Sequence, residues 1–289
     1  MVTSKGVKTN LKVFGLLSVL TALFLVGGLF IGGRLGLILG LVLASVMNFG
    51  SYWFSDKIVL KMYKAKEIEE SENPQLHRSL ERLAEDAGIP KPRLYKSDMN
   101  VPNAFATGRS PEKGVVCVTE GLLNHLDSDE VDAVIAHELA HIRNRDTLIN
   151  AVVATLAGAI AILAEMAFWG AMFGTRDRGG ADMISALVFM ITVPLIATVI
   201  RMSISRSMEF RADSDAVRIH GQKQGLSSAL EKISGENSKK RSDHYSRVQE
   251  SGANLFIENP FSSDSITGLF STHPPLERRI ENIQETELS

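Results

Sequence analysis

Four long runs of apolar residues most constrain what this chain can fold into. The first two, residues 13–31 and 35–54, contain no charged side chain, and each is long enough to cross a hydrocarbon core of about 30 Å as a helix. A second pair, residues 149–173 and 181–200, is joined by a short polar link, and Glu165 interrupts its first run. We predict two transmembrane hairpins. Two packed helices in a soluble core would give the second pair a similar pattern, so that alternative stays open.

Basic residues flank the first pair of runs on both sides. Three lysines precede the pair and four follow it, whereas Arg34 alone lies between the two runs. Because cytoplasmic flanks are enriched in Lys and Arg, we predict that both flanks are cytoplasmic. A cleaved signal peptide is a poor alternative, since its apolar region would be shorter and a second run follows at once. The flanking lysines are Lys5, Lys8, Lys12, Lys57, Lys61, Lys64 and Lys66.

The average composition hides this clustering. Hydrophobic residues make up 45% of the 289, and the mean hydropathy is only +0.06. The net charge of −2 and the pI near 6.4 give no support for nucleic-acid binding. Cys117 is the only cysteine, so an intramolecular disulfide is excluded. Without a second cysteine nearby, Cys117 is expected to be a small buried strand residue rather than a catalytic thiol.

The strongest chemical motif is His137, Glu138 and His141 in the arrangement H-E-x-x-H. Histidines four residues apart lie on one face of a helix, so their imidazoles can hold one Zn²⁺ while the adjacent carboxylate serves as a base. Asp127 and Glu130 form a capping-box pattern that opens this helix. The plain alternative is two surface histidines on an amphipathic helix.

A zinc site needs a third donor, and the distance from the apolar runs indicates where it lies. His141 precedes the third run by about eight residues, and Glu209 follows the fourth by about as many. At 1.5 Å per residue, both side chains would emerge at the same height, roughly 12 Å beyond the membrane. Glu209 is therefore the predicted third ligand. The same count places Asp213 level with His137, as a carboxylate that could accept the other ring N–H of that histidine.

Other groups compete for these roles. Asp215 and His220 are donors displaced along or around the same predicted helix, and Asp146 is too close to His141 in sequence to bend back easily. An ordinary charged helix face would also explain residues 209–213 taken alone. The choice among these donors depends on which helices pack together.

The remaining polar regions predict a mixed soluble domain. Asn73 and Pro74 open a helix that ends near Gly88, and short strands are expected at residues 93–95, 103–108 and 114–118. The fold class is therefore mainly α with a small β-sheet, with two transmembrane hairpins and a cytoplasmic, zincin-like catalytic domain. The predicted divisions are an N-terminal hairpin (1–56), the first part of the catalytic domain (57–148), a second hairpin (149–200) and the second part of the catalytic domain (201–289).

Residues 103–108 also suggest a way to bind substrate. Asn103, Ala104 and Phe105 could begin an edge strand that pairs with an extended peptide backbone. Because main-chain pairing reads few side chains, cleavage would then be broad in sequence. An internal strand with Phe105 in the core is the alternative.

Together these motifs resemble a known family. Residues 137–141, Glu209 with Asp213, residues 103–108 and the stretch 271–280 are similar to the HtpX family of bacterial membrane zinc endopeptidases, relatives of the Ste24 prenyl-protein protease. The resemblance covers nearly the whole chain. It implies that His137, His141 and Glu209 bind zinc and that Glu138 is the catalytic base. It also implies a multi-pass inner-membrane protease that clips damaged or misassembled membrane proteins during envelope stress, with its N-terminus and catalytic domain in the cytoplasm.

The implied chemistry is hydrolysis of a peptide bond by an activated water. Glu138 would take a proton from that water and pass it to the leaving amine. His273 and Arg278, in the stretch 271–280, are candidate donors to the oxyanion, although His273 before two prolines could equally be a turn residue.

Other functions remain as alternatives. A prenyl-protein protease like Ste24 would carry more membrane spans, a non-catalytic chaperone or scaffold could keep a zinc site, and a zinc transporter would place its ligands inside the bilayer. The expected partners are membrane-protein substrates and the lipid bilayer, with homo-oligomers or other quality-control proteases as further candidates, and no nucleic acid.

Overall fold

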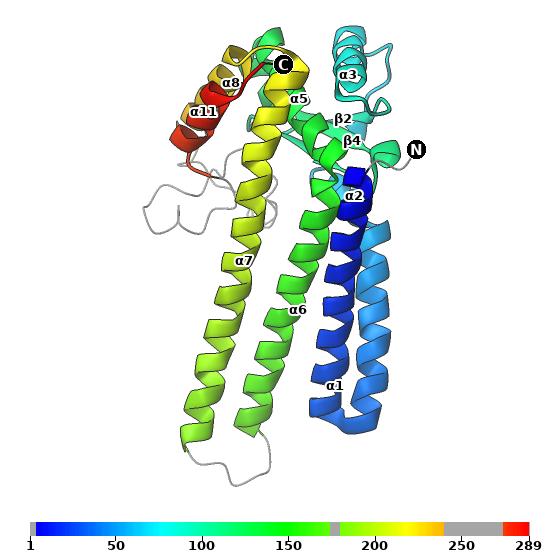
Figure 1. Cartoon of the computed structure of the whole chain (residues 1–289), viewed down its shortest axis with the longest axis vertical. Helices are drawn as coiled ribbons and strands as arrows, with labels where there is room; N and C mark the ends of the chain where they lie inside the picture. Colours follow the sequence, from blue (N-terminus) through cyan, green and yellow to red (C-terminus); the bar gives the residue numbers. More distant parts are fainter. Residues whose placement is uncertain (1–3, 174–179, 240–273, 289) are drawn as a thin grey trace. The chain divides into compact units, whose positions relative to one another are not determined.

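The computed structural model of the chain describes residues 4–173, 180–239 and 274–288 (Figure 1). The chain forms two compact units, each made from two separate stretches of sequence. Residues 1–54 and 149–203 form the first unit, and residues 55–148 and 204–289 form the second. The structure is mainly helical, with one small mixed sheet in the second unit, as the sequence predicted.

The first unit contains α1 (Ser4–Trp53), most of α6 (Asp146–Phe173) and the first part of α7 (Gly180–His220). Helix α1 is two helices joined by a sharp bend at Gly32 and Gly33, where Gly33 has the left-handed φ of +57°. The two halves approach closely, because a Cβ at Gly28 would lie 2.2 Å from the carbonyl oxygen of Gly36. Asn48 Nδ2 on the second half donates to Thr21 Oγ1 on the first at 2.9 Å.

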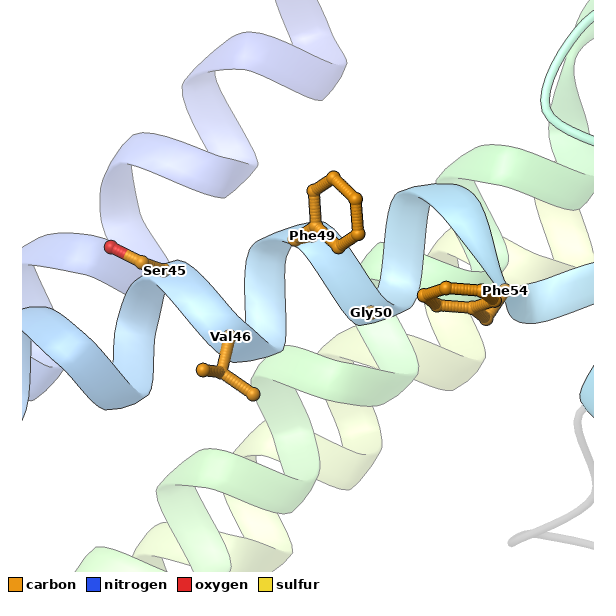
Figure 2. Close-up of a pocket in the computed structure, with 5 residues that line it drawn as sticks. All are labelled: Ser45, Val46, Phe49, Gly50 and Phe54. Atoms are coloured by element: carbon orange, nitrogen blue, oxygen red, sulfur yellow. The ribbon is translucent and has the colours of Figure 1, made fainter.

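Three segments of the described residues are long and apolar enough to cross a membrane: Leu11–Leu29, Gly32–Trp53 and Asp146–Met166. Their apolar side chains are largely turned outward, and Val46 and Phe49 are more than half exposed. Figure 2 shows an apolar hollow on the second half of α1, lined by Ser45, Val46, Phe49, Gly50 and Phe54. Outward apolar surface of this extent suits a lipid environment. The fourth predicted run, residues 181–200, forms the first half of α7, and its crossing of the membrane stays a prediction.

The second unit is built around a four-stranded sheet in the order β1-β2-β4-β3. The strands are β1 (Lys66–Glu67), β2 (Arg93–Ser97), β3 (Ala104–Thr107) and β4 (Val115–Thr119). Strands β2 and β4 are parallel, whereas β1 with β2 and β3 with β4 are antiparallel. The sequence predicted three of these strands and missed β1, whose two residues are too few for a pattern.

Helices of the second unit begin and end at local signals. Helix α3 (Pro74–Ala87) has Asn73 as its cap, whose side chain accepts from the Leu76 N–H at 3.1 Å, and it ends at Gly88 with a left-handed φ of +68°. The other short elements are α2 (Ser55–Met62), η1 (Pro111–Lys113), α4 (Glu120–His125), α5 (Ser128–Asn144), α8 (Gln224–Lys239) and α11 (Leu276–Glu285). The largest cluster of buried apolar side chains surrounds α5 and includes Leu80, Leu83, Ile135, Leu139, Leu230 and Ile283. A second, smaller cluster joins Leu60 of α2 and Tyr63 to Val101, Phe105, Val115 and Cys117.

Candidate metal centre

Helix α5 carries the H-E-x-x-H residues and is anchored at its N-terminus. Asp127 and Glu130 form a reciprocal capping box, in which each side chain accepts the other's backbone N–H at 3.0 Å. Glu130 also accepts from Ser228 and Lys232 of α8, at 2.5 and 2.7 Å. The N-terminus of α5 is therefore held by both its own cap and a neighbouring helix.

The two histidines are not surface residues. His137 is 2% exposed, His141 8% and Glu138 4%, and Leu139 and Ala140 between them are fully buried. The alternative of an amphipathic surface helix is therefore wrong, because α5 is enclosed on all sides over this stretch. Buried imidazoles need polar partners, so the surroundings of these two define the site.

Glu209 on α7 meets the two histidines. Its Oε1 lies 3.4 Å from Nε2 of His141, and its Oε2 lies 3.6 Å from Nε2 of His137. The two Nε2 atoms are 3.1 Å apart, with the imidazole planes nearly perpendicular. One donor atom from each of the three side chains lies within 4.8 Å of the others. Among the described residues this is the one His/Cys/Asp/Glu group able to hold a metal ion.

The donor set fits a tetrahedral cation. Ligand atoms held about 2.0–2.1 Å from Zn²⁺ at tetrahedral angles lie roughly 3.3 Å from one another. The two Nε2 atoms are 3.1 Å apart, and the nearest carboxylate oxygens of Glu209, Oε1 to His141 and Oε2 to His137, lie 3.4 and 3.6 Å from them, all close to this value. Two histidines and one carboxylate also match a known set of ligands for catalytic zinc. The residues present therefore fit a metal ion.

Each imidazole has a buried carboxylate behind it. Nδ1 of His137 lies 3.0 Å from Oδ1 of Asp213, and Nδ1 of His141 lies 3.1 Å from Oδ2 of Asp146. Both aspartates are completely buried. Such partners turn the Nε2 lone pairs toward the cluster. Asp146, which the sequence offered as a competing ligand, lies instead behind His141.

These contacts also set the charge states. Burial by itself would lower the pKa of both histidines, but the neighbouring carboxylates outweigh it and raise both, with the larger rise at His141. Burial would likewise raise the pKa of Asp213, but the Arg279 guanidinium and His137 hold it below its usual range. A site that attracts protons to its imidazoles attracts a cation to the same atoms, so protons and metal compete there.

Two arginines complete the group, and sequence reasoning missed both. Arg211 on α7 donates to Asp146, and Arg279 on α11 donates to Asp213. The sequence pointed instead to Arg278, which is exposed and pairs with Glu281 at 3.2 Å. The structure does not bring Arg278 to the cluster. The helical period contained the signal, because Leu276 and Ile283 mark the inner face of α11 and Arg279, three residues after the first and four before the second, falls on the same face. His273 lies outside the described residues.

The remaining competing donors have other partners. Asp215 pairs with Arg143 at 2.7 Å and accepts from Asn144 at 2.8 Å, and His220 lies 3.3 Å from Asp129. Neither belongs to the metal-binding group. Their displacement around α7 thus keeps them out of the cluster.

Strand β3 is an edge strand whose side chains are nevertheless buried. It pairs with β4 on one side and ends the strand order, while Ala104 and Phe105 are 1% and 3% exposed. Phe105 packs against Tyr63 with ring centroids 4.6 Å apart, and the Asn103 N–H donates to Thr119 Oγ1. The structure thus has β3 at the edge of the sheet with Phe105 in the core, and the binding of a substrate backbone at this edge stays a prediction.

A buried helix with H-E-x-x-H, completed by a glutamate from a second helix, defines the class of metal-dependent peptidases. The sequence comparisons agree. The family model described as Peptidase family M48 matches residues 70–287, and the chain belongs to this family. It is a membrane metalloendopeptidase.

Named relatives are similar over nearly the whole chain. A protein named "Protease HtpX homolog" from Desulforapulum autotrophicum is 49% identical over 273 residues, covering 93% of this chain and 87% of the relative. One of the same name from Pyrococcus furiosus is 47% identical over 275 residues, covering 93% of each. The resemblance to the HtpX family is thus confirmed.

A solved structure shares the fold. The crystal structure of S. mikatae Ste24p aligns with a TM-score of 0.54 and 21% sequence identity, covering 96% of this chain. The chain spans 64% of the length of that protein. At this identity the likeness concerns the fold alone.

Proposed function

We propose that this chain is a zinc-dependent endopeptidase that cleaves damaged or misassembled proteins in a bacterial inner membrane. The observation that carries the proposal is the buried cluster of His137, His141 and Glu209 beside Glu138 in a chain of a peptidase family. We assign the first three as ligands of one Zn²⁺. Two imidazoles and one carboxylate suit zinc, whereas magnesium and calcium prefer sites made of oxygen ligands alone.

Each side chain then has a defined task. When bound, Zn²⁺ lowers the pKa of a coordinated water and polarises the substrate carbonyl. Glu138 accepts a proton from the attacking water and returns it to the leaving amine. Asp213 and Asp146 hold the imidazoles of His137 and His141 in one orientation. Among the oxyanion candidates, Arg278 is disfavoured by its exposed pairing with Glu281, and His273 remains.

Substrate would bind by strand addition at β3. Ala104 and Phe105 begin β3, the last strand in the order, directly after Asn103, and Phe105 anchors the strand in the core. An extended peptide paired to this edge would be held mainly through its main chain, which predicts broad specificity. Access to the membrane surface, rather than side-chain sequence, would then select substrates.

The membrane topology follows from charge and hydropathy. The two halves of α1 would form one transmembrane hairpin, and residues 149–200 a second, with the domain divisions 1–56, 57–148, 149–200 and 201–289. The lysines that flank residues 13–54 support an N-terminus and a catalytic domain in the cytoplasm. Trypsin added outside intact spheroplasts should then cut at Arg176 or Arg178 in the link between residues 173 and 181, and resistance there would contradict the second hairpin.

The central test is a reconstitution experiment. The full chain is purified in detergent with a chelator, the chelator is removed, and cleavage of an unfolded test protein is followed with and without Zn²⁺. We expect zinc-dependent cleavage that falls about 10²–10⁴-fold in Glu138→Gln at unchanged zinc content. Glu281→Gln, which removes an exposed carboxylate, is the matched control. A wild-type chain that binds zinc without cutting would instead favour the scaffold alternative.

A further inference from the structure

The C-terminal helix α11 supplies a guanidinium to the metal-binding cluster from a distant part of the sequence. Arg279 is 2% exposed and donates two hydrogen bonds to Asp213, from Nε to Oδ2 at 2.9 Å and from Nη2 to Oδ1 at 2.6 Å. Nη2 also lies 3.6 Å from Oε2 of Glu209. Asp213 in turn faces Nδ1 of His137 at 3.0 Å. One side chain thus contacts a proposed ligand and the carboxylate that orients another.

We propose that Arg279 is a positioning residue for the metal site, so that cation binding and the docking of α11 stabilise each other. The proposal rests on the assignment of His137, His141 and Glu209 as ligands. The planar guanidinium holds both oxygens of Asp213 in one orientation. Oδ1 lies 3.0 Å from Nδ1 of His137, where it favours a proton on Nδ1 and so leaves Nε2 available for the cation.

The charges of the cluster support the same role. Arg211 pairs with Asp146, and Arg279 with Asp213 and Glu209, while Glu138 is buried next to His137 in the sequence. With both imidazoles neutral, as a bound cation requires, these four carboxylates and two guanidiniums sum to two negative charges, which a divalent cation would balance. Without Arg279, Asp213 would be a buried charge lacking its strongest partner, and such charges are costly. The six groups are Glu138, Asp146, Glu209, Asp213, Arg211 and Arg279.

Residues of α11 other than Arg279 also bind the helix to the rest of the second unit, through groups that are not proposed ligands. Asn282 Nδ2 donates to the Phe210 carbonyl at 2.9 Å, Lys223 Nζ donates to the Gln284 carbonyl at 2.6 Å, and Ile283 is fully buried. Arg279 therefore links a helix held by ordinary packing to the cluster. Because coupling free energies are reciprocal, a cation that favours the ordered cluster must also favour docked α11.

The first measurement is zinc affinity, by competition with a chromogenic chelator on the full chain in detergent. Arg279→Gln should bind Zn²⁺ about 10–100-fold more weakly than wild type. Arg279→Lys, which keeps the charge and loses the two-pronged geometry, should lie between them. Arg278→Gln is the matched control on the same helix, and it should stay within about twofold, because exposed pairs contribute little.

The second measurement is amide hydrogen exchange of residues 276–285 with and without Zn²⁺. In wild type and Arg278→Gln, zinc should slow exchange in α11. In Arg279→Gln, zinc should leave exchange unchanged. A merely structural role would give faster exchange in Arg279→Gln but the same slowing by zinc.

Zinc affinity in Arg279→Gln equal to that in Arg278→Gln would overturn the proposal. If Arg279→Gln does not fold, Asp213→Asn takes its place, and the same loss of zinc affinity is expected. Wild-type zinc affinity in Asp213→Asn would equally overturn the proposal. His137→Ala separates the two levels of inference. If His137→Ala binds zinc as tightly as wild type, the assignment of the ligands is wrong. If His137→Ala loses zinc affinity while Arg279→Gln keeps it, only the proposed role of Arg279 is wrong.

Discussion

Replacing Leu139 by Ala should destabilise the second unit strongly without removing a polar group. Leu139 lies between His137 and His141 on α5 and is fully buried in the core cluster. Helix α5 packs against α3, α8, β3 and β4, so the surroundings cannot collapse from one free side. The substitution therefore leaves a cavity in the core cluster around α5.

The size of the effect follows from this enclosure. Leu→Ala replacements in close-packed cores cost about 2.7–5.0 kcal/mol, and sites that cannot relax lie toward the upper end. Since 1.4 kcal/mol is a factor of ten in an equilibrium constant, even the lower limit means an opening equilibrium about 100-fold larger. Leu139→Met keeps the volume and should cost under about 1.5 kcal/mol, or about tenfold.

Cys117 provides the assay, because it is the only cysteine and is fully buried in β4 of the same unit. Where the unit recloses faster than a thiol reagent reacts, the labelling rate measures the opening equilibrium. Leu139→Ala should label at least about 100-fold faster than wild type, and Leu139→Met at most about tenfold faster. Equal rates for the two variants would refute the reasoning that α5 is the tightly enclosed centre of the unit.

Three further predictions test separate features. Burial raises the pKa of the Cys117 thiol to about 12, so almost no thiolate exists at pH 8. The native chain should therefore resist iodoacetamide until it is unfolded, and fast alkylation of the native protein would contradict this. Gly28→Ala should destabilise the α1 pair by about 1–3 kcal/mol in detergent melting curves, because its Cβ meets a carbonyl oxygen, whereas Gly50→Ala has open space and should not. Asp146→Asn should weaken zinc binding about 10–100-fold in chelator competition, and an equal loss in Asp215→Asn, outside the cluster, would point to a general structural effect.

The sequence alone was sufficient wherever the signal is local. The uncharged runs at residues 13–31 and 35–54, the cap at Asn73 and the capping box of Asp127 with Glu130 each depend on neighbours a few residues away. Because helix caps and hydrophobic periods depend only on a short stretch of chain, they can be recognised from the amino-acid sequence. The H-E-x-x-H spacing belongs to this class, and so does the membership of a peptidase family that follows from it and its companion motifs.

The tertiary structure decided which distant groups meet. Counting residues from the apolar runs predicted that Glu209 and Asp213 lie level with the two histidines, and both contact them. The stretch 271–280, however, pointed to Arg278 rather than Arg279, and Asp146 was expected to be too close in sequence to bend back, although it reaches His141. Those outcomes depend on the rotation of α7 and α11 about their axes, and one residue turns a helix by about 100°. That rotation is set by how buried side chains from separate helices interlock, so it emerges only when the second unit is packed.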